Sequence, residues 1–545
     1  MIYMINTIEK NIMKKIKSLT LILMVLFTTV ASAIDVVELP LPKSNKVVIQ
    51  LRFRNGSISD PAGKEGLTYL TSRLITEGGT QTMSREAITD QIYPWAASYG
   101  SSCDKEVSNF YFSVPADFLN PFYDIIKGLM LTPSFKEEDF NRVKSNQQNY
   151  VDQVIRSSSD EEYGKKALED LMFRGTNYQH LTQGTTNSIK SITLDDVKKQ
   201  YKNFFTRNNI TIGIAGNYSA EFLNKLKNDM ALLSAVQPAV PQPGKAAMPD
   251  GLNVEIVSKE NALGSAISAG FPMDITRAKD DFAALMVANS WLGEHRKSYS
   301  QLYKKIREAR SMNYGDYTYI EWYENGGGNM LPPSGTPRTS NYFSIWLRPV
   351  QTAKGLKGQY PELASITEGH AHYALRMALR EMDNLIKNGM KPDDFEATRT
   401  FLKSYMKLYV STPAAQLGYL MDSKFYGRKD YIKEMDALLS SLTVDDVNKA
   451  MRKYWQTKNM DIVVITDQSE AAPLAESLKT NAASPMSYSN GLKGALSQDI
   501  LDEDKQVENY PMPVKSVKIV KSDDTFRTVS SSSGSGDKGT VKMKK

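Results

Sequence analysis

The same order of predicted elements occurs twice in this 545-residue chain, on the two sides of a proline-rich segment. Apolar alternation predicts strands and amphipathic stretches predict helices in both halves. In the first half, strands are expected near 35–40, 46–55, 96–99, 109–114 and 210–215, with helices at 66–77, 84–93, 115–131, 136–155, 160–173 and 194–205. In the second half, strands are expected near 253–257, 265–270, 316–320, 342–347 and 460–465, with helices at 282–292, 300–308, 366–387, 392–410 and 444–452. Two successive α+β units of about 200 residues indicate an internal duplication, which we expect to be too diverged to show as sequence identity.

The proline-rich segment sets the expected domain boundaries. Residues 236–250 hold four prolines and suit an extended, semi-rigid connector. We therefore expect a first domain over 34–235 and a second domain over 251–490. Residues 491–545 are expected to be a tail that is partly disordered, since a serine- and glycine-rich stretch lies within it.

The N-terminus has the pattern of a targeting segment. Three lysines precede an apolar run over 19–30, and Ala31-Ser32-Ala33 is typical of a cleavage site. We predict that residues 1–33 are a signal peptide and that the mature chain is periplasmic, without a stable membrane span. The lone Cys103 cannot form an internal disulfide, which suits a periplasm better than a disulfide-stapled extracellular module. The net charge is +6, and positive residues are interspersed with negative ones, so the sequence does not indicate a nucleic-acid-binding surface.

One predicted helix carries an informative set of side chains. Leucines recur at helical spacing in residues 66–77, so one face of this helix is expected to meet a core. Tyr69, Ser72 and Arg73 share another face. Taken alone, this is equally a leucine-striped helix of an unrelated fold.

This segment resembles the zinc helix of the pitrilysin/insulinase-like metallopeptidases, where His-x-x-Glu-His follows a Gly-Leu pair and precedes a Gly-Thr pair. Further segments resemble the same family in the same order, namely 57–66, 108–117, 176–192, 208–217 and 290–314. The nearest branch is that of the mitochondrial processing peptidase type. The resemblance implies an α+β fold with two homologous α/β-sandwich domains, each an antiparallel-rich sheet with helices, that form half of a clamshell.

The family's metal positions are all changed here. Its two histidines bind zinc and its glutamate activates a water, but this chain has Tyr69, Ser72 and Arg73 at those positions. Tyrosine is a poor zinc ligand, serine is no practical general base, and an arginine repels a cation. The resemblance places the third ligand near Asn149, where the nearest carboxylate is Asp152. We therefore predict that this chain has no metal site and no cofactor of its own.

A second set of family residues is present. Arg307 and Tyr314 match, in spacing, an Arg/Tyr pair that in the family reaches from the second domain toward the substrate. A guanidinium can donate to a peptide carbonyl, and a phenol can donate to a developing oxyanion. The alternative is a surface arginine and a packed tyrosine. The resemblance implies a zinc-free subunit that pairs with a homologous zinc-bearing chain and binds a peptide or unfolded substrate through these two residues.

The sequence leaves some alternative functions open and disfavours others. A structural or scaffolding subunit and a peptide-binding protein without cleavage both remain alternatives. A self-sufficient hydrolase is disfavoured, since the chain has no nucleophile elbow and no further zinc motif. Glu368 and His372 could share a helix face while His370 points away, but two ligands do not close a metal site. His180 and His295 are expected to be loop residues.

Overall fold

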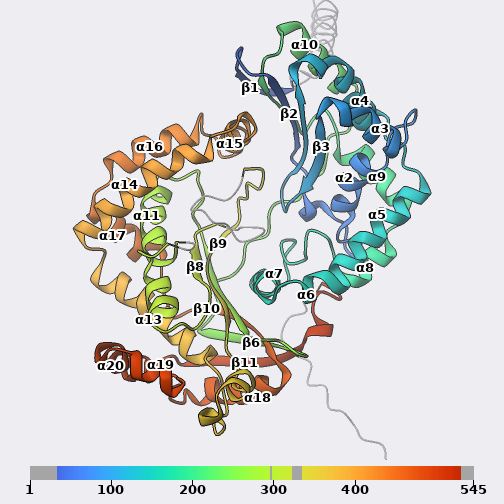
Figure 1. The fold of residues 1–545 in the computed structure, drawn as a ribbon. Helices are drawn as coiled ribbons and strands as arrows, with labels where there is room; N and C mark the ends of the chain where they lie inside the picture. The colour runs from blue at the N-terminus through green and yellow to red at the C-terminus, as the bar shows by residue number, and fades with distance from the viewer. Residues whose placement is uncertain (1–33, 295–296, 322–333, 530–545) are drawn as a thin grey trace, which may run out of the picture.

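The computed structural model describes residues 34–294, 297–321 and 334–529. The predicted signal peptide, His295 and the end of the predicted tail therefore lie outside the described residues. Figure 1 shows two α+β units, the first coloured blue to cyan and the second green to red. Across the described ranges, no helix has both the length and the apolar character that a membrane crossing requires.

The first sheet has five strands in the order β1-β5-β2-β4-β3. Their bounds are β1 Asp35–Pro40, β2 Lys46–Phe53, β3 Ser98–Cys103, β4 Ser108–Pro115 and β5 Ile210–Gly216. The edge pair β1–β5 is parallel and the other neighbouring strands are antiparallel. Phe53, Phe110 and Phe205 meet edge to face in its core, with centroids 5.2 to 5.9 Å apart, because aromatic rings prefer this offset geometry.

Nine helices lie within residues 34–235 of the first domain. They are α2 Leu67–Glu77, α3 Arg85–Ile92, α4 Leu119–Leu131, α5 Glu137–Asn149, α6 Ile155–Ser157, α7 Asp160–Met172, α8 Thr186–Ser191, α9 Leu194–Phe204 and α10 Ala220–Met230. The helix expected over 136–155 is interrupted, because a π-helical turn over Tyr150–Val154 follows α5. The structure places α2 against α5 and α9, so the helix of interest is held from several sides.

The second sheet has the order β11-β6-β10-β7-β9-β8. Its strands are β6 Leu252–Lys259, β7 Ser265–Met273, β8 Asp316–Tyr319, β9 Asn341–Val350, β10 Met460–Asp467 and β11 Val514–Lys521. Without β11, this order repeats the first sheet strand for strand, including the parallel pair β6–β10. The fold confirms the α+β class with two homologous domains.

The second domain has ten helices among its described residues. They are α11 Asp281–Gly293, α12 Ala353–Gln359, α13 Ala371–Asn388, α14 Pro392–Tyr409, α15 Pro413–Phe425, α16 Tyr431–Ser441, α17 Val444–Tyr454, α18 Gln468–Thr480, α19 Asn490–Ala495 and α20 Gln498–Val507. The residues expected to form a helix at 300–308 include a π-helical turn over Tyr303–Glu308. Helix α13 begins five residues later than expected.

Our expectation that the duplication leaves no sequence identity is wrong at one element. The chain reads Thr-Leu-Asp-Asp-Val at 193–197 and Thr-Val-Asp-Asp-Val at 443–447. Both stretches form capping boxes, in which Thr193 or Thr443 accepts from the backbone of Asp196 or Asp446 and the aspartate accepts in return. The capped helices α9 and α17 each precede the equivalent strand, β5 or β10. The first four backbone N–H groups of a helix have no acceptor within the helix, so a side chain that caps them is favoured in both domains.

The two domains exchange helices. Helix α7 of the first domain packs on β7 and β10, and α15 of the second domain packs on β5 and β1 (Figure 1). The approach is close on both sides. A Cβ on Gly164 of α7 would lie 3.0 Å from Ser268 Oγ, and a Cβ on Gly213 of β5 would lie 2.8 Å from Met421 Sδ. One face of each sheet is therefore covered by a helix from the other domain.

The predicted tail is the clearest difference from expectation. Its described part, up to residue 529, contains α20 and β11, and β11 pairs in parallel with β6. Lysines interrupt the apolar alternation of β11, whose sequence is Val-Lys-Ser-Val-Lys-Ile-Val-Lys. Lysines are typical of an edge strand, and here they break the apolar alternation by which a strand is predicted from sequence. The connector over 236–250 forms no helix or strand, and the Asn177 side chain bonds the backbone of Gln242 and Gly244.

Candidate functional site

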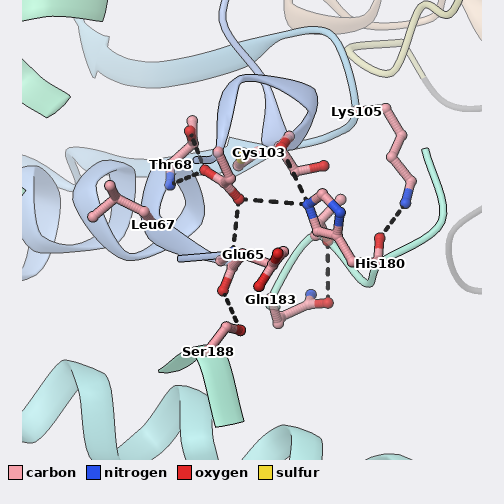
Figure 2. A network of polar contacts seen from close by, with 12 residues as sticks. Glu65, Leu67, Thr68, Cys103, Lys105, His180, Gln183 and Ser188 are labelled. Carbon is pink, nitrogen blue, oxygen red and sulfur yellow. Dashed lines mark hydrogen bonds and ion pairs between the residues drawn. The ribbon is translucent and has the colours of Figure 1, made fainter. Parts of the chain in front are cut away.

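The lead-in to α2 is fixed by a buried aspartate. The Asp60 carboxylate accepts hydrogen bonds from the backbone N–H groups of Gly66 and Thr68, each at 2.7 Å, and from the Thr68 hydroxyl at 2.6 Å. His180 Nε2 lies 3.1 Å from the carbonyl oxygen of Ser57 and 3.6 Å from Asp60. Figure 2 shows Thr68 and His180 in this network, with Ser188 bonded to the backbone of Glu65. His180 lies in a loop, as expected, but its side chain is buried. The start of α2 is therefore rigidly placed.

The middle of α2 meets the first sheet through hydroxyl groups. Ser72 is buried, and its Oγ lies 2.9 Å from the carbonyl oxygen of Thr68 and 3.3 Å from Ser108 Oγ. Ser108 in turn donates to the carbonyl oxygen of Asn55 at 2.7 Å. The Ser72 hydroxyl is satisfied within a packed contact, so it has no role as an exposed base.

The positions of the two family histidines carry a phenol and a guanidinium. Tyr69 is partly buried, and the Arg73 side chain is 40% exposed and forms an ion pair with Glu77, one helical turn away. Arg142 of α5 donates to the backbone carbonyl of Glu77 at 2.6 Å, which brings a second guanidinium to this end of the helix. Guanidinium groups offer no lone pair to a metal. These residues do not fit a zinc ion.

The region of the family's third ligand supports α2 instead. Asn149 is exposed at the end of α5, and Asp152 accepts from Gln148 at 2.7 Å and from Thr186. Gln147 is buried and donates to the carbonyl oxygens of Gly66, at 3.0 Å, and Gln183, at 2.7 Å. Across the described ranges, no group of three or more His, Cys, Asp or Glu side chains is placed to hold a metal ion. The role of Gln147 in holding the lead-in was not predictable, because a buried glutamine has no distinctive sequence signal.

Arg307 and Tyr314 lie together in the second domain. Arg307 is carried by the π-helical turn after Leu302, a feature that is frequent at functional sites. Its guanidinium carbon lies 4.7 Å from the ring centroid of Tyr303 and 5.4 Å from that of Tyr314, within cation–π range. Tyr314 is 73% exposed. The pair is therefore a surface feature, with one partly buried cation and one accessible phenol.

The structure does not join the two predicted sets of residues within one site. Helix α2 belongs to the first domain and the Arg307 turn to the second. Figure 1 shows α2 and β8, the strand that follows this turn, in different domains.

Next to the turn, Asp316 is fully buried, and burial raises its pKa well above the ordinary value in spite of a hydrogen bond from Asn313 and the charge of Arg307. Burial thus favours a neutral carboxyl beside the arginine.

His370 and His372 are buried structural residues. His372 Nδ1 lies 2.8 Å from Ser477 Oγ, which donates to Glu368 at 3.0 Å. His370 Nε2 lies 3.0 Å from the carbonyl oxygen of Ser487. Burial lowers the pKa of His370 to about 4, and burial, followed by the charge of a nearby arginine, lowers the pKa of His372 to about 3. The expectation that Glu368 shares a helix face with His372 is wrong, because α13 begins after Glu368 and Ser477 lies between the two side chains.

Comparison with protein families gives two successive matches, and the second begins inside the first domain. Residues 36–186 match the model described as insulinase, peptidase family M16, and residues 191–345 match the model described as the peptidase M16 inactive domain. Together the two matches include the first sheet and the second sheet as far as the start of β9, whereas β10 and β11 lie beyond them.

Comparison with individual proteins gives distant relatives. The chain is 20% identical over 436 residues to an uncharacterized zinc protease of Streptomyces coelicolor, which covers 78% of this chain and 86% of the relative. It is 26% identical over 280 residues to the non-peptidase homolog YmxG of Helicobacter pylori, covering 49% of this chain and 61% of the relative. A solved peptidase M16 inactive domain from Pseudomonas fluorescens has a TM-score of 0.67 at 18% identity, covering 80% of this chain and 96% of that one. A chain of complex III from Candida albicans has a TM-score of 0.61 at 12% identity, covering 79% and 93%. At these identities the solved structures show a shared fold.

Proposed function

Since this chain belongs to peptidase family M16 and has changed residues at all of the family's metal positions, we propose that it is a zinc-free, catalytically incomplete subunit of a two-chain metallopeptidase. The observation that carries the proposal is a contrast within one molecule. The metal positions hold Tyr69, Ser72 and Arg73, whereas Arg307 and Tyr314 are kept and lie together on the surface.

The environment of α2 supports the first half of the proposal. A chain that had lost a single ligand would still offer the remaining ones around an open site. Here Ser72 is bonded within a packed contact, and Arg73 is paired with Glu77. The resemblance to a Helicobacter pylori protein described as a non-peptidase homolog agrees with loss of the chemistry. Zinc is then proposed for a homologous partner chain, where it would activate a water.

The second half of the proposal concerns substrate. The Arg307 guanidinium has donors in a planar fork, and a peptide carbonyl between it and the exposed Tyr314 phenol could accept from both. The Tyr303 ring, whose centroid lies 4.7 Å from the guanidinium carbon, restrains the arginine side chain. The two residues would hold one carbonyl of a peptide while the partner chain supplies the cleavage chemistry. We place this two-chain enzyme in the periplasm, on the strength of the signal-like residues 1–33.

A pull-down from the native cell tests this proposal. The full-length chain would carry a C-terminal tag, and the eluate would be assayed on a quenched peptide with and without a chelator. Recovery of a chain with His-x-x-Glu-His, together with chelator-sensitive cleavage, supports the two-chain peptidase. Recovery of the chain alone, or of a complex without peptidase activity, favours the scaffolding function and overturns the proposal.

A further inference from the structure

The C-terminal segment 482–529 has no counterpart in the first domain. Helix α20 and strand β11 follow β10 and α18, after the duplicated order of strands is complete. This segment contacts the turn that carries Arg307. We propose that α20 positions Arg307 for substrate through the carboxylates of Glu503 and Asp504; this inference rests on the proposed substrate role of Arg307.

The main contact is a buried arginine next to the functional one. Arg310 is only 1% exposed, and its Nε donates to Asp504 Oδ1 at 2.7 Å while its Nη2 donates to Glu503 Oε2 at 2.9 Å. The third nitrogen, Nη1, donates to the backbone carbonyl of Lys305 at 2.7 Å. One guanidinium therefore joins α20 to the backbone of the turn. Such a charged network is rigid when all its members are paired.

Lys305, a second cation of the turn, also contacts Glu503. Lys305 Nζ lies 2.6 Å from Glu503 Oε1. A π-helical turn bonds residues that are five apart, so Lys305 and Arg310 fall on nearly the same side of it. This shared side faces α20, while Arg307 between them lies over Tyr303 and Tyr314. The two anchoring cations, Lys305 and Arg310, therefore contact α20, whereas Arg307 contacts the two tyrosine rings.

The two carboxylates are themselves held in place. Asp504 is 6% exposed and accepts from the hydroxyls of Tyr373 and Tyr488, the latter at 2.7 Å. Glu503 also accepts from Arg380 of α13 at 3.2 Å. The donors Lys305 and Arg310 lower the pKa of Glu503 against the effect of burial, so this carboxylate stays ionised. The anchor is therefore preformed on the second domain.

The far end of the segment is attached to the first domain. The backbone N–H groups of Thr186 and Asn187 donate to the carbonyl oxygens of Phe526, at 2.9 Å, and Arg527, at 3.1 Å. Phe526 is buried against Tyr163, with ring centroids 5.8 Å apart. Because both ends are fixed, α20 cannot shift freely with the turn it holds. This geometry favours a positioning role over a loose tail.

The test uses the full-length chain with Glu503→Gln and Asp504→Asn combined, and Glu503→Gln alone as a milder variant. The matched control is Asp502→Asn on the same helix, which changes only exposed contacts, with Lys505 and Gln498. Hydrogen exchange of residues 303–314 is expected to rise about tenfold or more in the double variant and less in the single one, with the control unchanged. Unchanged exchange in both variants would overturn the proposal.

A second readout separates positioning from general loss of stability. In the two-chain complex, the double variant is expected to lower kcat/KM about as much as Arg307→Ala, and the two changes combined are expected to cost little more than either alone. Additive losses would show that α20 acts independently of Arg307 and would overturn the positioning role. Faster local exchange in a complex that shows no cleavage with any variant would leave the anchoring intact and refute the proposed peptidase function instead.

Discussion

The hydroxyl oxygens of Ser72 and Ser108 lie 3.3 Å apart across the contact between α2 and β4. Ser72 stands at the position where the family's motif has its glutamate. In an active member that side chain must face a metal-bound water. Here it faces the sheet, and the neighbouring Ser101 hydroxyl donates to its backbone carbonyl at 3.0 Å. The face of α2 that would hold the catalytic acid is packed against the first sheet, so changes at Ser72 are expected to alter stability.

Restoring the acid at this position is expected to destabilise the chain. Ser72→Glu would bury a carboxylate without a cation and is expected to lower the free energy of unfolding by about 2–4 kcal/mol. Ser72→Ala, the control, removes hydrogen bonds only and is expected to cost about 1 kcal/mol. Urea denaturation of the purified chain measures both. A Ser72→Glu variant as stable as the natural chain would contradict a closed hydroxyl contact.

The surface pair is expected to act on cleavage and not on assembly. Arg307→Ala removes a charged donor and is expected to lower kcat/KM of the two-chain complex about 10- to 100-fold, with a smaller loss for Tyr314→Phe. Lys304→Ala, an exposed cation on the same turn, serves as the control and is expected to have little effect. Affinity for the partner chain, measured by titration calorimetry, is expected to stay the same. If both pair variants keep full activity, the chain is a scaffold.

The exchange of helices between domains predicts an unequal effect of two glycine substitutions. Gly213→Val would press on Met421 of α15 and is expected to cost about 1–3 kcal/mol, because added carbons strain a packed contact. Gly100→Val on the edge strand β3 meets no atom within 4 Å and is expected to be near neutral. Thermal unfolding, with limited proteolysis of the 236–250 connector, compares the two. Equal behaviour would show that α15 is not needed on the first sheet.

The buried His372 predicts a loss of stability on mild acidification. Burial lowers its folded-state pKa to about 3, whereas an unfolded histidine titrates near 6.5. The unfolded chain therefore binds the extra proton as pH falls below about 6.5, and the folded state loses stability down to about pH 3. Between pH 6.5 and 5.0 this single group is expected to cost about 2 kcal/mol.

The control for this effect is His372→Gln, which keeps a polar side chain near Ser477 without a titrating group. Its unfolding free energy is expected to fall less steeply between pH 6.5 and 5.0 than that of the natural chain. The slope difference, taken from urea denaturation at several pH values, isolates this group from the other titrating side chains. Equal slopes would mean that His372 is accessible and ordinary.

The sequence predicts the local elements of this fold better than their contacts. The alternation in 46–55 and the leucine spacing in 66–77 correctly indicate a strand and a helix, although β2 is buried on both of its faces. Strand β11 was not expected, since its lysines follow from its place at a sheet edge. The repeated Thr-x-Asp-Asp-Val motif is a local pattern that the sequence carries at both helix starts.

The same limit applies to the candidate site, where single residues can be predicted from the sequence but their contacts cannot. The family resemblance singled out Arg307 and Tyr314, and the structure brings their side chains into contact. The anchor between Arg310 and Asp504 joins residues 194 positions apart, so no local pattern could reveal it. The closed environment of Ser72 depends equally on Ser108, a residue of another element. Partners that are distant in sequence decide what these side chains can do.

The most direct test of the central claim is to measure zinc and peptide cleavage separately for each chain of the complex. The tagged chain and its co-purified partner would be separated, analysed for bound zinc by elemental mass spectrometry, and assayed alone and after recombination. We predict that zinc is found only in the partner and that cleavage by the recombined pair exceeds that of either chain. Stoichiometric zinc in this chain, or cleavage by this chain alone, would contradict the account.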